Sequence, residues 1–207
     1  MRHAKASANH AAAVRHGKKL EYFTIGWNSL EALIAIASGI AAGSVALVGF
    51  GFDSVIEVSS GAALLWRLQM DTGLRQEHAE RVTLRIVGWC FLALGAYVAY
   101  DSITSLLLRE APAGSRVGIA LAAVSLVVMP LLARAKRKVA TEIRSAALTA
   151  DARQTQLCTY LSAILLGGLT LNALWGWWWA DPVAALVMLP IIFKEGVDAL
   201  RGKTCCC

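Results

Sequence analysis

Runs of roughly 20 apolar residues recur along this chain, and a helix of that length crosses the roughly 30 Å hydrocarbon core of a bilayer. Hydrophobic residues make up 57% of the 207, and the mean hydropathy of +0.56 is too high for a soluble domain. We therefore predict an all-α integral membrane protein. Its six transmembrane helices are expected at residues 22–43, 44–67, 83–108, 114–134, 152–174 and 179–198.

The basic residues are distributed unevenly around these runs. The net charge is +6, and 18 of the 20 Lys and Arg fall at one end of the expected spans, whereas only Arg109 and Arg116 fall at the other. Because Lys and Arg are enriched in cytoplasmic loops, this asymmetry predicts that both termini are cytoplasmic. The basic excess is then a topology signal, and we expect no nucleic-acid partner.

We expect three segments along the chain. They are a basic cytoplasmic N-terminal tail at residues 1–21, a six-helix transmembrane domain at 22–200 and a Cys-rich cytoplasmic tail at 201–207. The tail at 1–21 is expected to be disordered or a surface helix, and the polar segment 70–85 a short cytoplasmic loop. Cysteines inside spans and in a reducing compartment do not predict a disulfide framework.

Two acids interrupt the second apolar run. Asp53 and Glu57 are four residues apart, so a helix places them on the same face, which Gly49 and Gly61 extend. An acid at bilayer depth costs about 3 kcal/mol, and acids that are kept there are usually functional. A divalent cation held between the two carboxylates would offset that cost. The pair therefore predicts a metal site within the membrane.

The fifth run carries a second pair at the same spacing. Gln154 and Cys158 fall at a depth that overlaps that of Asp53 and Glu57, so the two helices offer four candidate metal ligands if they pack together. Carboxylate oxygen and thiolate sulfur both suit Zn²⁺, whereas an amide oxygen is a poorer ligand. The plainer alternatives are a Cys158 that packs as a small apolar residue and a Gln154 that bonds a neighbouring helix.

Other residues are weaker candidates. Glu31 and Asn28 in the first run, and Asp101 in the third, could form a further metal or proton site. His78 belongs to a QEHAE motif that could bind metal, although this spacing is also common on solvated loops. The last three residues, Cys205, Cys206 and Cys207, could bind Zn²⁺ or Cu⁺ or accept an acyl chain.

Three stretches carry a family resemblance: SVALVGFGFDSVIE at 44–57, LTADARQTQLC at 148–158 and WADPVAA at 179–185. With the order of spans over residues 22–200, they resemble the cation diffusion facilitator, or cation efflux, family. The resemblance implies divalent-metal efflux by a homodimer. It also implies a transport site that pairs Asp-x-x-x-Asp or His-x-x-x-Asp on the second helix with the same motif on the fifth.

Carried over by position, that site comprises Asp53, Glu57, Gln154 and Cys158. Gln154 and Cys158 depart from the His and Asp of the family pattern. The family's C-terminal cytoplasmic domain is absent from this sequence, which we interpret as a minimal, divergent member.

Our leading prediction is proton-coupled efflux of Zn²⁺, or a similar divalent transition metal, from the cytoplasm across the cell (inner or plasma) membrane. Its expected partners are metal ions, protons, the lipid bilayer and a second copy of the chain, with no organic cofactor. The alternative is a non-transporting metal sensor or accessory subunit with the same fold. GFGFD and YD also suggest an intramembrane aspartyl protease, but their spacing and order are wrong, so we expect no enzyme.

Overall fold

The computed structural model describes residues 2–67, 74–109, 112–143 and 145–201. The described part is entirely α-helical, as predicted. Its six helices are α1 (Arg2–Ala42), α2 (Val45–Arg67), α3 (Leu74–Leu108), α4 (Arg116–Ile143), α5 (Ala146–Trp175) and α6 (Ala180–Leu200).

Three of these helices begin after a serine. The hydroxyl of an N-cap serine accepts a bond from a backbone N–H in the first turn, which otherwise has no partner there. Ser44, Ser115 and Ser145 each accept from the N–H three residues on, which belongs to Leu47 (3.2 Å), Gly118 (3.0 Å) and Leu148 (3.3 Å) respectively. The sequence therefore marks where α2, α4 and α5 start.

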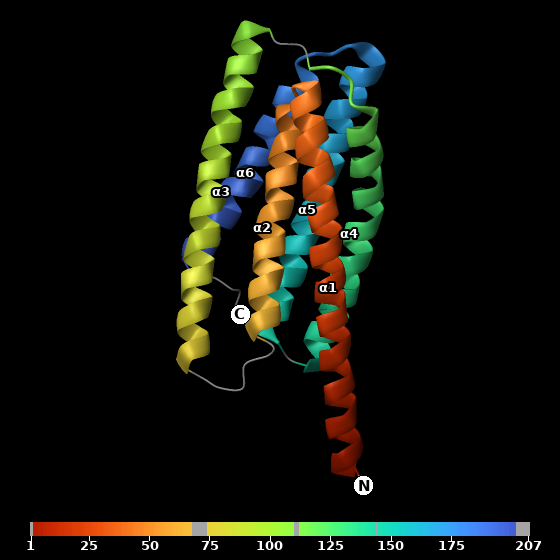
Figure 1. Ribbon diagram of the computed structural model, residues 1–207, viewed down its shortest axis with the longest axis vertical. Helices are drawn as coiled ribbons and strands as arrows, with labels where there is room; N and C mark the ends of the chain where they lie inside the picture. The colour runs from red at the N-terminus through yellow and green to blue at the C-terminus, as the bar shows by residue number, and fades with distance from the viewer. Residues whose placement is uncertain (1, 68–73, 110–111, 144, 202–207) are drawn as a thin grey trace.

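Four helices form a closed ring in the order α1, α2, α5, α4 (Figure 1). Each of the four packs against the next, and α4 returns to α1. Outside this ring, α6 packs against α5, α2 and α3, and α3 also contacts α2. The face of α2 that carries the acid pair can therefore meet α1 on one side and α5 on the other.

Small residues bring α1 and α2 close together. A Cβ atom placed on Gly51 would lie 2.6 Å from Ile36 Cγ1, and one on Gly39 would lie 2.9 Å from the backbone nitrogen of Val48. Any larger residue at either position would push the two helices apart. Gly43, with φ of 65°, turns the chain between them.

Five of the helices in the described part are long and apolar enough to cross a membrane. The segments that meet this description are Ala12–Ala42, Val45–Trp66, Gly88–Leu108, Arg116–Ile143 and Asp151–Trp175. The chain is therefore a multi-pass membrane protein. The remaining helix, α6, carries Asp181, Lys194, Glu195 and Asp198 within its 21 residues and is not one of the five.

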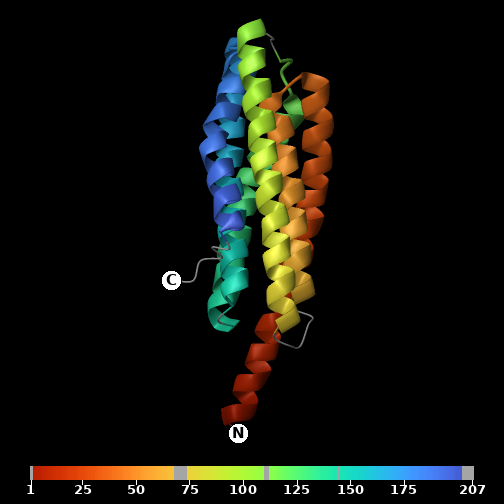
Figure 2. The same cartoon turned by 90° about the vertical axis from the view of Figure 1, so that its left-hand side faces the viewer.

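One expectation about the connecting segments differs from the structure. Residues 74–85 belong to α3, so the prediction of a loop was wrong from Leu74 onward. The N-terminal segment is helical, which is one of its two expected alternatives, and it continues the first spanning helix, because α1 runs unbroken from Arg2 and extends beyond the other helices (Figure 2). Both segments are rich in Ala, Arg, Glu or Lys, which have high helix propensity even where they lack an apolar stripe.

Candidate metal site

The centre of the ring holds a thiol between two carboxylates. Cys158 of α5 donates its S–H toward Asp53 Oδ2 at 3.1 Å and Glu57 Oε2 at 2.8 Å, both on α2. The side chains of all three residues are buried, with at most 5% of their surface exposed. We call Asp53, Glu57 and Cys158 the acid–thiol site. The structure thus brings together three of the four residues that the sequence singled out.

The fourth residue, Gln154, lies one turn before Cys158 on α5. Its Nε2 atom is buried and has no hydrogen-bond partner among the described residues. No hydrogen bond within the described part joins it to Asp53 or Glu57. Gln154 is therefore one helical turn from the site along α5. Its amide nitrogen still has N–H donors without acceptors in the described part.

The donor set of the acid–thiol site suits a borderline-soft divalent cation. Two carboxylates supply oxygen and Cys158 supplies sulfur, which is a combination that Zn²⁺ accepts. The Cys158 thiol contacts both carboxylates directly. In the described part of the chain, no group of three or more His, Cys, Asp or Glu side chains is arranged to hold a metal ion as it stands. A cation would have to replace the contacts that the thiol makes.

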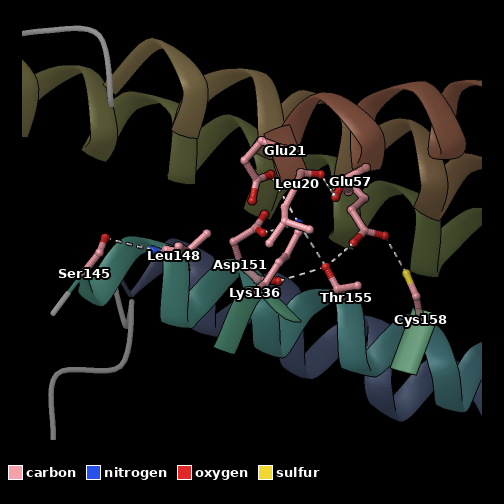
Figure 3. A network of polar contacts seen from close by, with 10 residues as sticks. Leu20, Glu21, Glu57, Lys136, Ser145, Leu148, Asp151, Thr155 and Cys158 are labelled. Carbon is pink, nitrogen blue, oxygen red and sulfur yellow. Dashed lines mark hydrogen bonds and ion pairs between the residues drawn. The ribbon is translucent and has the colours of Figure 1, made fainter. Parts of the chain in front are cut away.

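A polar network continues from the acid–thiol site toward the end of the bundle where α1 begins (Figure 3). Thr155 donates its hydroxyl to Glu57 Oε1 at 2.8 Å and accepts a bond from Lys136 Nζ at 3.3 Å. Lys136 also forms ion pairs with Glu21, at 3.2 Å, and with Asp151. We call Glu21, Lys136 and Asp151 the lysine triad. Its members come from α1, α4 and α5.

None of the three residues of the lysine triad was predicted as a site residue from the sequence. Lys136 was counted only as one of the basic residues at the ends of the spans, yet its side chain is 0% exposed. A sequence signal existed in Glu21, which is the only acid among the first 30 residues. The signal does not reveal that the partner of this acid is 115 positions away.

Glu31 lies in a separate polar cluster. Its two carboxylate oxygens accept the hydroxyl protons of Ser54, at 3.0 Å, and of Ser125. Asn28, one turn earlier on α1, is 0% exposed, and both of its amide atoms lack hydrogen-bond partners in the described part. The structure therefore places Glu31 in a polar cluster with Ser54 and Ser125, on α1, α2 and α4, and leaves Asn28, among the described residues, without a bond to it.

Of the remaining candidates, Asp101 has a side chain that the structure describes. Asp101 is half-buried on α3 and accepts a bond from Tyr97, one turn earlier, at 3.4 Å. His78 lies in the first turns of α3, and its side chain is outside the described part. Residues Cys205, Cys206 and Cys207 also lie outside the described residues.

Asp181 is a buried acid with a different environment. It lies in the first turn of α6, where its Oδ1 accepts the Ser44 hydroxyl at 2.6 Å and its Oδ2 accepts the Ala46 N–H at 3.4 Å. Acids near the first turn of a helix are favoured by the helix dipole. Asp181 therefore fastens the start of α6 to the start of α2, away from the acid–thiol site.

Buried charge is unbalanced across the described residues. They include six buried acidic side chains, Glu21, Glu31, Asp53, Glu57, Asp151 and Asp181, and one buried basic side chain, Lys136. A buried charge is costly unless it is paired or coordinates a metal. Five of the six acids lie on helices of the ring, Asp181 of α6 being the exception, so the interior of the ring is suited to taking up cations or protons.

Comparison with known proteins identifies a family for this chain. A family model described as the cation efflux transmembrane domain matches residues 23–203. The chain belongs to the cation efflux family. Proteins of the cation efflux family are membrane transporters of divalent metal cations rather than enzymes.

A curated relative adds a second comparison. Transmembrane protein 163 of Xenopus laevis is 23% identical over 182 residues. The alignment covers 87% of this chain and 65% of the relative, so the chain spans less than two thirds of the relative's length. The similarity therefore covers most of this cation efflux protein but a smaller share of the relative.

Proposed function

We propose that this cation efflux protein exports a divalent transition metal, with Zn²⁺ as its preferred substrate, in exchange for protons. The observation that carries the proposal is the buried Cys158 thiol held between the Asp53 and Glu57 carboxylates. Placing these two acids at bilayer depth costs free energy, and a bound cation would offset that cost. Gln154 is proposed as a fourth, weaker ligand or as a residue that orients a water molecule.

Proton coupling follows from the chemistry of the ligands. A thiol binds a metal as its thiolate and a carboxyl group binds as its carboxylate, so metal binding releases protons. In the structure the Cys158 S–H bonds to both carboxyl groups. When the cation arrives, the thiol proton leaves and sulfur and oxygens turn to the metal. When the cation departs on the other side, a returning proton restores the hydrogen-bonded arrangement.

The excess of buried acids supports the same exchange. With one buried base against six buried acids, the described interior cannot neutralise itself by ion pairs. Protons and divalent cations are the two species that can compensate the difference in turn. Export is the direction implied by the family, with both termini cytoplasmic and the protein acting as a homodimer in the cell membrane.

Flux measurements on purified protein in liposomes test the proposal. Under a pH gradient, Zn²⁺ uptake reported by an enclosed dye should be lost in Asp53→Asn and in Glu57→Gln, because each keeps the side-chain shape but removes a ligand charge. Glu142→Gln is the matched control, since it neutralises an exposed acid of a spanning helix outside the site.

Two results would contradict the proposal in different ways. Normal Zn²⁺ flux in Asp53→Asn or Glu57→Gln would remove the acid–thiol site from the transport path. A wild-type protein that binds Zn²⁺ tightly but moves none across the liposome membrane would instead favour a metal sensor or accessory subunit.

A further inference from the structure

Lys136 is a charged side chain enclosed by the four-helix ring. Its ammonium group is 0% exposed and reaches three acceptors: Glu21, Asp151 and the Thr155 hydroxyl. An ammonium group has three N–H donors, so each donor finds an acceptor from a different side chain. Figure 3 shows the carboxyl groups of Glu21 and Asp151 turned toward this ammonium. The lysine triad is thus a cation held between two carboxylates.

The two carboxylates can accept more hydrogen bonds than the lysine donates to them. Glu21 Oε1 and Asp151 Oδ1 are both buried and have no hydrogen-bond partner within the described part of the chain. A single ammonium therefore satisfies one oxygen of each acid and leaves the other oxygen without a contact. Buried ion pairs of this kind are weak contributors to stability compared with apolar packing, so stability alone is a poor reason to keep one.

The triad lies beside the acid–thiol site, on the side where α1 begins and α4 meets α5. One hydroxyl connects them, because Thr155 lies 3.3 Å from Lys136 Nζ and 2.8 Å from Glu57 Oε1. A cation that left the two carboxylates would meet Glu57 next.

We propose that Glu21 and Asp151 form an access site for the divalent cation, and that Lys136 closes this site by occupying it with its own ammonium group. The inference rests on the proposed function of the acid–thiol site. An incoming cation displaces the ammonium, is held by the two carboxylates and then passes Thr155 to Glu57.

The chemistry of the three side chains fits this exchange. Two carboxylates carry the charge that a divalent cation requires, whereas the lysine supplies only half of it. Their oxygens suit hard cations such as Mn²⁺ as well as Zn²⁺. The lysine side chain is a flexible four-carbon stem, and Lys136 is two turns from the end of α4, so its ammonium can withdraw toward that end while the stem remains buried.

Counting bound Mn²⁺ tests the access site directly. The count is made by electron paramagnetic resonance of free Mn²⁺, in an Asp53→Asn background that disables the acid–thiol site. Adding Lys136→Met should raise bound Mn²⁺ by one per chain, because the access site loses its internal occupant. Adding Glu21→Gln and Asp151→Asn as well should abolish the gain. Lys138→Met, an exposed change on the same helix, is the matched control and should leave the count unchanged.

Transport kinetics supply a second measurement, made on a different variant, in case the chain with Lys136→Met and both acids intact does not fold. The combined variant Glu21→Gln, Lys136→Met, Asp151→Asn has no charge left to pair. If the access site captures the cation, its KM for Zn²⁺ should rise at least about tenfold, as expected when metal-binding groups are weakened. Its kcat should stay near that of the wild type.

The inference is overturned by either of two outcomes. One is an unchanged Mn²⁺ count in the Lys136→Met chain together with an unchanged KM in the combined variant. The other is loss of folded protein in both, which would make the triad a purely structural ion pair. The Mn²⁺ count is made with the acid–thiol site disabled, so it tests the access site separately from the proposed function. The access site can be refuted while Asp53 and Glu57 still prove essential for flux. Likewise, the count can rise as expected while Asp53 and Glu57 prove dispensable.

Discussion

The bond between Asp181 and Ser44 should be a major contributor to the stability of the helix bundle. Asp181→Ala removes a charge-assisted hydrogen bond of 2.6 Å and a longer contact of 3.4 Å to the Ala46 N–H, at a site with 0% exposure. A hydrogen bond to a charged group contributes about 1.5–3 kcal/mol, and the donors left behind are buried. We expect Asp181→Ala to lower the free energy of unfolding by about 3 kcal/mol.

Ser44 allows the contribution of this bond to be isolated. Ser44→Ala should cost the same bond plus about 1 kcal/mol, because the hydroxyl also caps α2 through the Leu47 N–H at 3.2 Å. The double variant should then cost less than the sum of the single variants by about 1.5–3 kcal/mol. Ser145→Ala, at an N-cap without an acid partner, is the control for capping alone and should cost about 1 kcal/mol.

Unfolding by titration with SDS in mixed micelles measures these differences. Circular dichroism follows the helices, and tryptophan fluorescence follows the turn between α5 and α6, where Trp177 and Trp179 stack at 5.1 Å beside Asp181. The reasoning fails if the single costs simply add, within about 0.5 kcal/mol, because residues in contact should couple more strongly than that.

Four further predictions concern transport and topology. Cys158→Ser should shift the flux preference from Cd²⁺ toward Mn²⁺, because it replaces soft sulfur with oxygen. Cys158→Asp should raise Mn²⁺ flux. If competition between the metals is unchanged in both variants, Cys158 is a packing residue. Zn²⁺ affinity, measured by calorimetry, should rise with pH because the ligands lose protons on binding, and a pH-independent affinity would contradict proton exchange. A reporter after Cys207 should be cytoplasmic and one inserted at Ala113 external, and the reverse would overturn the topology. Deleting Cys205–Cys207 should lower flux only at limiting metal, so loss at saturating metal, with normal membrane abundance, would place the tail in the transport path.

The sequence predicts the parts of this molecule that depend on local periodicity. Asp53 and Glu57 share a face because one helical turn separates them, and Cys158 was found because its helix repeats that spacing. The structure joins all three. The starts of α2, α4 and α5 are marked by serine caps that act over three residues, a local signal that was not used in the prediction, which placed the start of the fifth span at 152 rather than Ala146.

Contacts between distant helices could not be predicted in the same way. Lys136 pairs with Glu21 across 115 positions, and Ser44 bonds Asp181 across 137. Such pairs depend on which helices are neighbours and on how each is rotated about its axis, and an apolar run reports neither. A basic residue near the end of a span also fits the topology rule whether it faces the cytoplasm or the interior, so the pattern alone could not distinguish a buried Lys136.

The tight turn between α1 and α2 has a consequence for how the protein enters the membrane during synthesis. Each of these helices carries two acids, and at about 3 kcal/mol per acid neither inserts well into lipid by itself. Paired, they give one acid a partner at once: Glu31 accepts the Ser54 hydroxyl across the interface that Gly39 and Gly51 make close. Because only Gly43 and Ser44 connect the helices, they cannot leave the translocation channel far apart. We therefore expect the first two helices to insert as a pair, whereas Asp53 and Glu57 meet Cys158 only after α5 has been synthesised.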